Sequence, residues 1–361
     1  MFLRFALPAA LVFSLPFAAV AQENQPAPQT SQLADQRTYC AYLTEQAKAQ
    51  SDYLRSPDAL ADFTQPETGL PTQLVGGAEL SLANLKKAGI TLDVARKNCE
   101  LYKATTNVQT FLQYALPGIE KDSLTHRLSL IGDASKSLES LIDQTTRMVD
   151  AQNMTRPMLL GLVTNRIKLD SDRADTQSKI AALYVPPLSQ EPLKVQVAEK
   201  QASDVDAQKA LDHLTRQNNW DVALSVGAHQ QIVPLADGVQ PYGEISVTYN
   251  LGSHVIDKHL DRTVDAYASW KKVQENDAVR GMAVLHDQVL ENIAAQKNRL
   301  ATLQQESHEI ARNLQLVGNA ETTAALDFRN QLASTQLLLG IETGDATYRL
   351  DRLQDFLSRN F

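Results

Sequence analysis

Hydrophobic and polar residues alternate strictly in two neighbouring stretches within residues 220–251. The apolar positions are Val222, Leu224, Val226 and Ala228, then Ile245, Val247, Tyr249 and Leu251. The positions between them are small or polar: Asp221, Ala223, Ser225 and Gly227, then Glu244, Ser246, Thr248 and Asn250. A period of two residues is typical of β-strands. Prolines and glycines separate the two stretches, so we predict a β-hairpin.

The predicted hairpin fits two environments. Each arm has about the length of a tilted strand in a membrane barrel, roughly 9–11 residues, and one apolar and one polar face are typical of such barrels. A soluble antiparallel hairpin with one wet face shows the same alternation. A lone hairpin is marginally stable in water, so this one needs further strands from this chain or from another subunit.

If the hairpin lines a barrel, its two faces predict two sets of positions. The lumen-facing candidates are Ser225, Gly227, Ser246, Thr248 and Asn250. The lipid-facing candidates are Val222, Val226, Val247 and Tyr249.

The rest of the chain is predicted to be helical, because Ala, Leu, Gln and Glu dominate it. We expect helices over residues 32–56, 79–115, 124–149, 157–183, 194–218, 253–317 and 320–358. Residues 57–78 contain three prolines and three glycines, so we expect a loop there. We expect Pro117-Gly118 to break the chain and Ser123 to cap the next helix. No strand is expected in this first half.

Apolar residues spaced by alternating steps of four and three predict coiled-coil seams on two of these helices. The first seam is Leu124, Leu128, Ile131, Ser135, Leu138, Ile142, Thr145 and Val149. The second is Val289, Ile293, Gln296, Leu300, Leu303, Ser307, Ile310, Leu314 and Val317. The helix predicted over residues 253–317 would be on the order of 95 Å long. Gly318-Asn319 then fits a helix C-cap.

The first residues have the composition of a secretory signal peptide. Arg4 precedes an apolar run over residues 5–17, and Ala19-Val20-Ala21 fits the cleavage pattern. We therefore expect residues 1–21 to be removed and residues 22–31 to form a disordered lead-in. No later stretch reaches the roughly 18 apolar residues of a membrane helix, so the sequence predicts an exported protein without a helical anchor.

Net charge argues against nucleic acid as a partner. Removing residues 1–21 takes away only Arg4 from 34 Lys and Arg, so 33 remain against 42 Asp and Glu, a net charge of −9. An acidic chain with interspersed charges indicates solubility rather than a basic binding surface.

The two cysteines, Cys40 and Cys99, form an even pair in a chain expected to be exported. Such a pair predicts a disulfide. It would tie two helices side by side and stabilise them by roughly 4 kcal/mol on the chain-entropy model. The alternative is two buried thiols. Without matched histidine spacing, two cysteines do not predict a zinc site.

The sequence shows no catalytic or cofactor-binding motif. His254 and His259 are five residues apart, which suits neither a zinc-protease helix nor a zinc finger, and His308-Glu309 lacks the second histidine of HExxH. A GxSxG elbow, a P-loop and a dinucleotide fingerprint are all missing from the sequence. We therefore expect no enzyme, no metal site and no cofactor.

Three stretches carry a family resemblance: WDVALSVGA, YGEISVTYNLG and LQLVGNAETTAALDFRNQLASTQLLL. With the helices around them, residues 195–355 resemble one half of a TolC-family outer-membrane efflux protein. That family joins two long helices at a Val-Gly turn, followed by a Thr and an apolar residue. Here Val317, Gly318, Thr322 or Thr323, and Leu326 occupy those positions. The match covers somewhat under half of the chain.

The resemblance implies an oligomeric conduit for efflux or type I secretion, without catalysis. In the family the helices span the periplasm and the strands join a barrel shared between subunits at the outer membrane, in contact with lipid. The helix tips meet a periplasmic adaptor and an inner-membrane pump or exporter. Carried over, the predicted partner-contact residues are Val317, Gly318, Asn319, Thr322 and Thr323.

The chain departs from the family pattern in its first half. The family has two tandem halves, each with a strand pair, whereas we expect no strands before residue 220. A homotrimer would then supply six strands, fewer than the eight at the low end of membrane barrels. A wide pore would need more subunits or a hybrid assembly.

The predicted fold class is mainly α, with long antiparallel coiled-coil helices and one β-hairpin. The predicted parts are a signal peptide (1–21), a lead-in (22–31), a disulfide-linked helical pair (32–116), a helical hairpin with a proline linker (117–192) and a TolC-like half (193–361). Two other hypotheses stay open. One is a soluble periplasmic coiled-coil adaptor or scaffold, and the other is a degenerate TolC relative that forms no pore.

Overall fold

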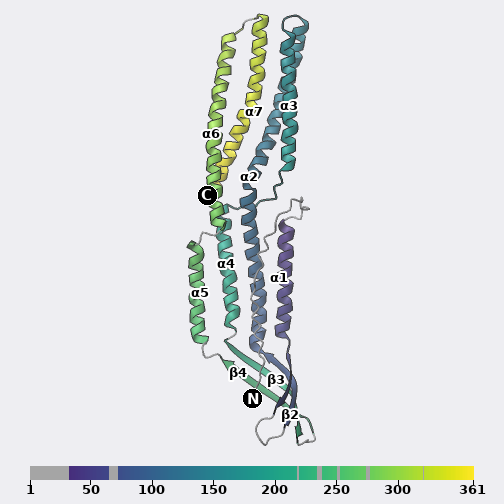
Figure 1. Cartoon of the computed structure of the whole chain (residues 1–361), viewed down its shortest axis with the longest axis vertical. Helices are drawn as coiled ribbons and strands as arrows, with labels where there is room; N and C mark the ends of the chain where they lie inside the picture. Colours follow the sequence, from purple (N-terminus) through teal and green to yellow (C-terminus); the bar gives the residue numbers. More distant parts are fainter. Residues whose placement is uncertain are drawn as a thin grey trace.

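Long helices run between a four-stranded sheet at one end of the molecule and two helix turns at the other (Figure 1). The computed structural model describes residues 32–64, 72–217, 219–233, 238–249, 253–273, 277–319 and 321–361. The predicted signal peptide and lead-in lie outside these residues. The helices are α1 (Gln32–Arg55), α2 (Leu82–Asp150), α3 (Arg156–Ala182), α4 (Leu193–Arg216), α5 (Ser253–Val273), α6 (Asp277–Val317) and α7 (Thr323–Asn360).

The helices are arranged differently in the two halves of the molecule. Near the sheet, α1 packs on α2, α2 on α4 and α4 on α5, so four helices stand side by side. Towards the other end, α2 turns back into α3 and α6 into α7, and α7 packs on both α2 and α6. Helix α2 links the halves because its 69 residues span about 100 Å. The predicted fold class, mainly α with long antiparallel helices, is confirmed.

The sheet consists of two hairpins rather than one. Its antiparallel strands lie in the order β1 (Asp58–Thr64), β2 (Thr72–Ser81), β3 (Trp220–Val233) and β4 (Gln240–Tyr249). The predicted hairpin is confirmed as β3 and β4. The loop predicted over residues 57–78 is wrong, because most of it forms β1 and β2. Pairing with β1 and β3 stabilises β2, which offsets the weak strand preference of Gly76 and Gly77.

The predicted helix break at Pro117-Gly118 is also wrong, because α2 continues with Pro117 inside it. A proline removes one helical hydrogen bond and crowds the preceding turn. Burial of Ala115 and Ile119 in the core offsets that cost. Ser123 caps no helix, since its buried hydroxyl donates a hydrogen bond to α7. The predicted boundary between the helical pair (32–116) and the helical hairpin (117–192) therefore falls inside one helix, α2.

The segment predicted as one helix over residues 253–317 forms two helices, α5 and α6. They have different neighbours, because α5 packs on α4 whereas α6 packs mainly on α7. Residues 274–276 lie outside the described part of the chain. The predicted seam is confirmed along α6, where Val289 and Ile293 are buried and the later seam positions are half-buried.

Two apolar clusters hold the helices together. The larger lies at mid-length between α2, α4, α6 and α7, and its most buried members are Val108, Leu193, Val289 and Leu353. The smaller lies nearer the helix turns, and its most buried members are Ile131, Leu138, Leu162 and Leu169. Ile131 and Leu138 belong to the first predicted seam, which is thereby confirmed as the face of α2 that packs on α3 and α7.

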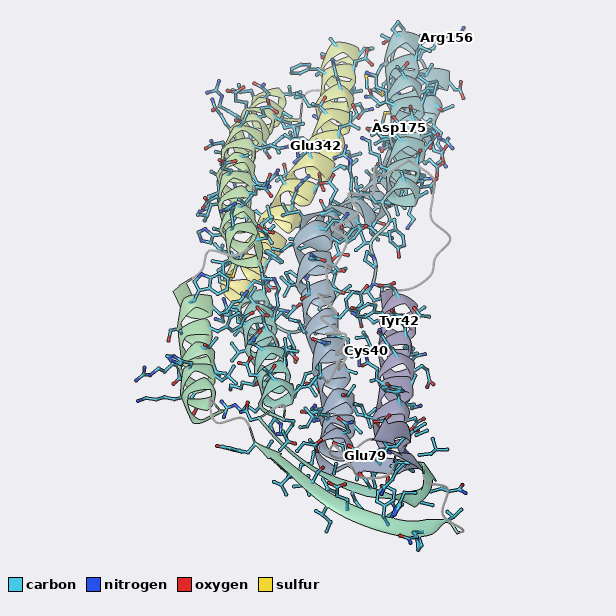
Figure 2. All side chains as sticks on the ribbon, turned by 60° about the horizontal axis from the view of Figure 1, so that its bottom comes forward. Cys40, Tyr42, Glu79, Arg156, Asp175 and Glu342 are labelled. Atoms are coloured by element: carbon cyan, nitrogen blue, oxygen red, sulfur yellow. A yellow bond between two sulfur atoms is a disulfide. The ribbon has the colours of Figure 1, made fainter. Side chains whose placement is uncertain are left out.

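The predicted disulfide between Cys40 and Cys99 is present and joins α1 to α2, with Cα atoms 5.1 Å apart (Figure 2 labels Cys40). Near it, the rings of Tyr39 and Tyr102 lie with their centroids 4.0 Å apart. The Tyr102 hydroxyl donates to the carboxylate of Asp35 at 2.6 Å. Because α1 packs on α2, these contacts fix the helix that stands beside β1.

Candidate functional site: the two-faced sheet and the helix turns

One face of the sheet is apolar from Trp220 to Ala228. In an antiparallel sheet, directly paired residues project from the same face. The register forms one row from Leu80 through Leu224 to Ile245 and a second row from Val222 to Val247. Three of these side chains are exposed, since Ile245 and Val247 keep 71% of their surface and Leu224 keeps 48%, whereas Leu80 and Val222 are half-buried. A contiguous apolar face of this kind indicates an interaction surface.

The opposite face carries the acidic side chains of the sheet, together with the apolar residues Leu60, Val75 and Ala223. One row of paired residues crosses all four strands and consists of Asp58, Glu79, Ser225 and Glu244. The Ser225 hydroxyl donates to the Glu79 carboxylate at 3.3 Å, and Figure 2 labels Glu79 in the sheet. The four strands contain no lysine or arginine, so this face is electronegative.

The division of the hairpin into two faces agrees with the sequence pattern. Ser225, Gly227, Ser246 and Thr248 lie on the polar face, and Val222, Val226, Val247 and Tyr249 lie on the apolar face. Asn250 lies outside the described residues. The assignment of the polar face to a lumen and of the apolar face to lipid stays a prediction. Strands β1 and β2 were not predicted, because the residues between Leu74 and Glu79 (75–78) are Val, Gly, Gly and Ala and give little contrast between the two faces.

A tyrosine covers two glycines on the polar face. Gly77, Gly227 and Tyr242 are paired across β2, β3 and β4. A Cβ atom on Gly227 would lie 2.8 Å from both the Cα of Gly77 and the Tyr242 ring. The ring therefore fills the space that side chains leave empty at both glycines, so the three strands approach closely at this level.

The sheet is attached to the helices through Asp221. Its carboxylate accepts hydrogen bonds from the Ser81 hydroxyl at 2.7 Å and from the Ala83 amide at 3.2 Å. The Ser81 hydroxyl in turn accepts from the Asn84 amide at 3.0 Å and so caps α2. An acidic side chain at a helix N-terminus is also favoured by the helix dipole. The start of β3 is thereby fixed to the start of α2.

The turn between α6 and α7 has the predicted glycine at the end of α6, and Thr322 directly precedes the next helix. Gly318 adopts a left-handed conformation at φ 55°, where glycine is favoured. The Thr322 hydroxyl caps α7 by accepting from the Ala325 amide at 3.3 Å. Gly318, Asn319, Thr322 and Thr323 are exposed, and Val317 is half-buried. Their role in contacting a partner stays a prediction.

The turn between α2 and α3 lies at the same end (Figure 1) and is bonded to α7. The Thr155 hydroxyl donates to the Asp327 carboxylate at 2.6 Å, and the Thr155 amide donates to it at 3.3 Å. The two residues are 172 positions apart, so no local sequence pattern could pair them. The bond joins the two helix turns within one chain.

An ion-pair cluster joins α2, α6 and α7 in the same half. Arg127 lies 2.5 Å from Glu342 and 3.4 Å from Asp345, and Arg299 also pairs with Glu342. The Ser123 hydroxyl donates to Asp345 at 2.8 Å. Burial alone would raise the pKa of Glu342, but hydrogen bonds and charges from Arg127 and Arg299 outweigh it and lower that pKa. The carboxylate is therefore held ionised.

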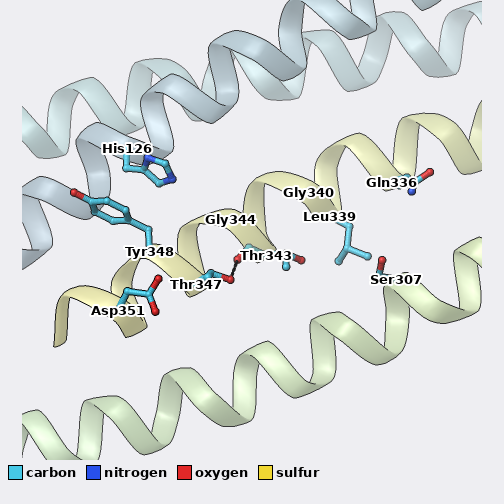
Figure 3. Close-up of a pocket in the computed structure, with 10 residues that line it drawn as sticks. All are labelled: His126, Ser307, Gln336, Leu339, Gly340, Thr343, Gly344, Thr347, Tyr348 and Asp351. Atoms are coloured by element: carbon cyan, nitrogen blue, oxygen red, sulfur yellow. Dashed lines mark hydrogen bonds between the residues drawn. The ribbon is translucent and has the colours of Figure 1, made fainter. Parts of the chain in front are cut away.

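A cavity of about 540 Å³ lies beside α7 (Figure 3). Short side chains of α7 line it, among them Thr343 and Thr347, and His126 stacks on Tyr348 with centroids 4.2 Å apart. The Thr347 hydroxyl donates to the backbone oxygen of Thr343 at 2.8 Å. Within this described lining no hydroxyl is hydrogen-bonded to His126.

No three His, Cys, Asp or Glu residues of the described ranges are placed to hold a metal ion. None of the helices in these ranges combines the length and the apolar character needed to cross a bilayer.

Comparison with known proteins gives structural likeness only. No protein-family model matches the sequence, and no curated protein matches it. A membrane protein from Pseudomonas aeruginosa is 12% identical, with 90% of this chain and 86% of that chain covered and a TM-score of 0.47. The outer membrane protein VceC of Vibrio cholerae is 13% identical, with 92% and 94% covered and a TM-score of 0.42. The MtrE outer membrane channel of Neisseria gonorrhoeae is 12% identical, with 90% and 87% covered and a TM-score of 0.42.

Proposed function

We propose that the protein is a component of an outer-membrane channel for efflux or secretion and acts as a conduit without catalysis. In this proposal the sheet inserts into the membrane, with its apolar face toward lipid and its polar face toward a water-filled lumen. The long helices extend from the sheet into the periplasm. The helix turns at their far end meet a periplasmic adaptor and an inner-membrane pump or exporter.

The observation that carries the proposal is the distribution of exposure on the sheet. A sheet in water buries its apolar face and exposes its polar face. On the central strand β3, Leu224 of the apolar face keeps 48% of its surface, whereas Ser225 of the polar face keeps 6%. On the edge strand β4, side chains of both faces are exposed. Leaving several large apolar side chains in water costs about 1.5–3 kcal/mol each relative to burial. Lipid contact would remove that cost.

The edges of the sheet support an oligomer. In the described strands, β1 and β4 each have one strand neighbour, and unpaired backbone groups cannot face lipid. Pairing β1 of one copy with β4 of the next would close the edges. Three copies with four strands each would supply twelve strands, above the eight at the low end of membrane barrels. The shortage of strands expected from one hairpin per copy, six strands in a trimer, therefore does not arise.

Membrane fractionation of the processed protein, followed by mild-detergent extraction and determination of the particle mass, tests the proposal. We expect recovery in the outer-membrane fraction as an oligomer, and the mass divided by the chain mass gives the strand count. Recovery as a soluble monomer or dimer would contradict the channel and favour the periplasmic scaffold. Recovery in the membrane without conductance in planar bilayers would favour a relative that forms no pore.

A further inference from the structure

The apolar face of the sheet ends in two paired aromatic residues. Trp220 begins β3 and pairs with Tyr249 at the end of β4. Strand alternation places both on the apolar face, one step beyond the pair formed by Val222 and Val247. Tyr249 keeps 55% of its surface. Trp220 closely follows α4 along the chain and Tyr249 closely precedes α5, so the aromatic pair lies at the helix end of the sheet.

A lysine from a neighbouring helix lies over the indole. The Lys86 Nζ is 4.2 Å from the centre of the Trp220 ring. Lys86 is exposed in the second turn of α2, and Leu82, one turn earlier, keeps 44% of its surface. No carboxylate of the described residues lies within ion-pair distance of Lys86. A cation, an indole and a phenol thus lie together at one border of the apolar face.

The border is held in position from the other face. Asp221 follows Trp220 and projects oppositely, and its carboxylate accepts from the Ser81 hydroxyl and the Ala83 amide. These bonds fix the backbone of β3 against the start of the helix that carries Lys86. The lysine and the indole therefore keep their separation without relying on a flexible loop.

The chemistry of this border fits a membrane surface. From Val222 to Ala228 the apolar face runs for seven residues, about 23 Å of strand at 3.3 Å per residue. Because barrel strands are tilted by about 35–45°, this length rises about 16–19 Å along the membrane normal, which is within the roughly 25 Å apolar band of membrane barrels. Tryptophan and tyrosine prefer the headgroup level because one end is apolar and the other polar. A lysine at that level attracts anionic lipid phosphates.

We propose that Lys86, Trp220 and Tyr249 bind the headgroup of an anionic phospholipid and mark one boundary of the membrane. The inference rests on the proposed insertion of the sheet and adds the lipid class and the level of insertion. Lys86 supplies the charge that pairs with the lipid phosphate. The two rings contact the glycerol region.

Fluorescence of a single tryptophan tests the lipid class. The chain contains only Trp220 and Trp270, so Trp270→Phe leaves Trp220 as the reporter. The full processed chain is placed in vesicles that combine phosphatidylcholine with phosphatidylglycerol, one lipid carrying bromine as quencher. We expect phosphatidylglycerol to be preferred about fivefold next to Trp220. Lys86→Gln should abolish the preference, and Lys87→Gln, the adjacent lysine, should keep it.

A second reporter separates this inference from the proposed function. Leu224→Trp, in a chain with Trp220→Phe and Trp270→Phe, places an indole in the middle of the apolar face. We expect bromine deep in the acyl chains to quench it most, and bromine near the headgroup to quench Trp220 most. If the indole at position 224 is not quenched by any lipid, insertion itself is refuted. If the indole at position 224 is quenched, insertion stands. The headgroup site is then overturned if Trp220 is not quenched, or if Trp220 shows no phosphatidylglycerol preference that depends on Lys86.

Discussion

At the scale of single residues, Gly227 limits how closely the strands can approach. A Cβ atom there would lie 2.8 Å from the Cα of Gly77 and from the Tyr242 ring. We predict that Gly227→Ala destabilises the sheet by about 1–3 kcal/mol, because backbone atoms of β2 must move. Faster hydrogen exchange of the amides in β2 and β3 would report the loss. Gly243→Ala is the matched control, since a Cβ atom there meets nothing within 4 Å.

Glu342 gives a second prediction at this scale, with a defined pH dependence. Its folded-state pKa is held below the ordinary value of 4.5 because the arginines outweigh burial. The contribution of the ionised Glu342 to the free energy of unfolding is therefore complete above about pH 4.5. It is lost as the pH falls through the lowered folded-state pKa. We predict that Glu342→Gln costs about 1–2 kcal/mol at pH 7, a low value because the side chain is a third exposed.

Chemical unfolding of the wild type and of Glu342→Gln at several pH values measures this difference. The difference in the free energy of unfolding between the wild type and Glu342→Gln should become smaller as the pH is lowered below 4.5. Glu139→Gln removes a more exposed ion pair with Arg166 and should cost at most about 0.5 kcal/mol. A gap that stays constant into acid would show that the charge of Glu342 is not the source of the stabilisation.

At the scale of elements, the disulfide determines how firmly α1 is held. It closes a loop of 59 residues that contains β1 and β2. On the chain-entropy model such a cross-link contributes about 4 kcal/mol. We predict that reduction releases α1 selectively, seen as faster hydrogen exchange in α1 than in α3. The Cys40→Ser/Cys99→Ser variant should exchange equally fast with and without reductant, and unchanged exchange in the reduced wild type would contradict the prediction.

The two hairpins of the sheet show which elements the sequence could predict. In β3 and β4, Val, Leu and Ile alternate with Ser, Thr and Asp, so the contrast between faces is strong. In β2 the apolar face reads Leu74, Gly76, Ala78 and Leu80, and glycine and alanine give almost no contrast. Pairing with β1 and β3 makes this segment a strand. That pairing is a long-range effect that local pattern cannot contain.

Local sequence pattern is equally limited in predicting where helices end and which distant residues contact each other. Pro117 is a strong local signal for a break, yet core packing on both sides of it keeps α2 continuous. The seam with Ile131 and Leu138 could be predicted because burial follows a regular spacing. The bond from Thr155 to Asp327 could not, since it depends on where two distant helix turns meet.

At the scale of the whole molecule, a single copy leaves strand edges unpaired and an apolar face exposed at the sheet end. Helices α1, α2, α4 and α5 stand side by side there, above a sheet with two unpaired edges in its described strands. The electronegative face and the apolar face lie on opposite sides of that sheet. Closure with further copies would give every strand two neighbours and would place the two faces in different surroundings, one wet and one lipidic.

Two adjacent positions on β4 distinguish these surroundings. Ile245 keeps 71% of its surface on the apolar face, and Glu244 is exposed on the polar face. We predict that Ile245→Lys sharply lowers recovery in the membrane fraction, because a lysine facing lipid near mid-membrane costs about 2–4 kcal/mol in each copy. Glu244→Lys adds the same side chain one residue away, and recovery should match the wild type because a wet lumen accepts it. Equal recovery of both variants would mean that the apolar face does not contact lipid, and a greater loss with Glu244→Lys would mean that the two faces are assigned the wrong way round.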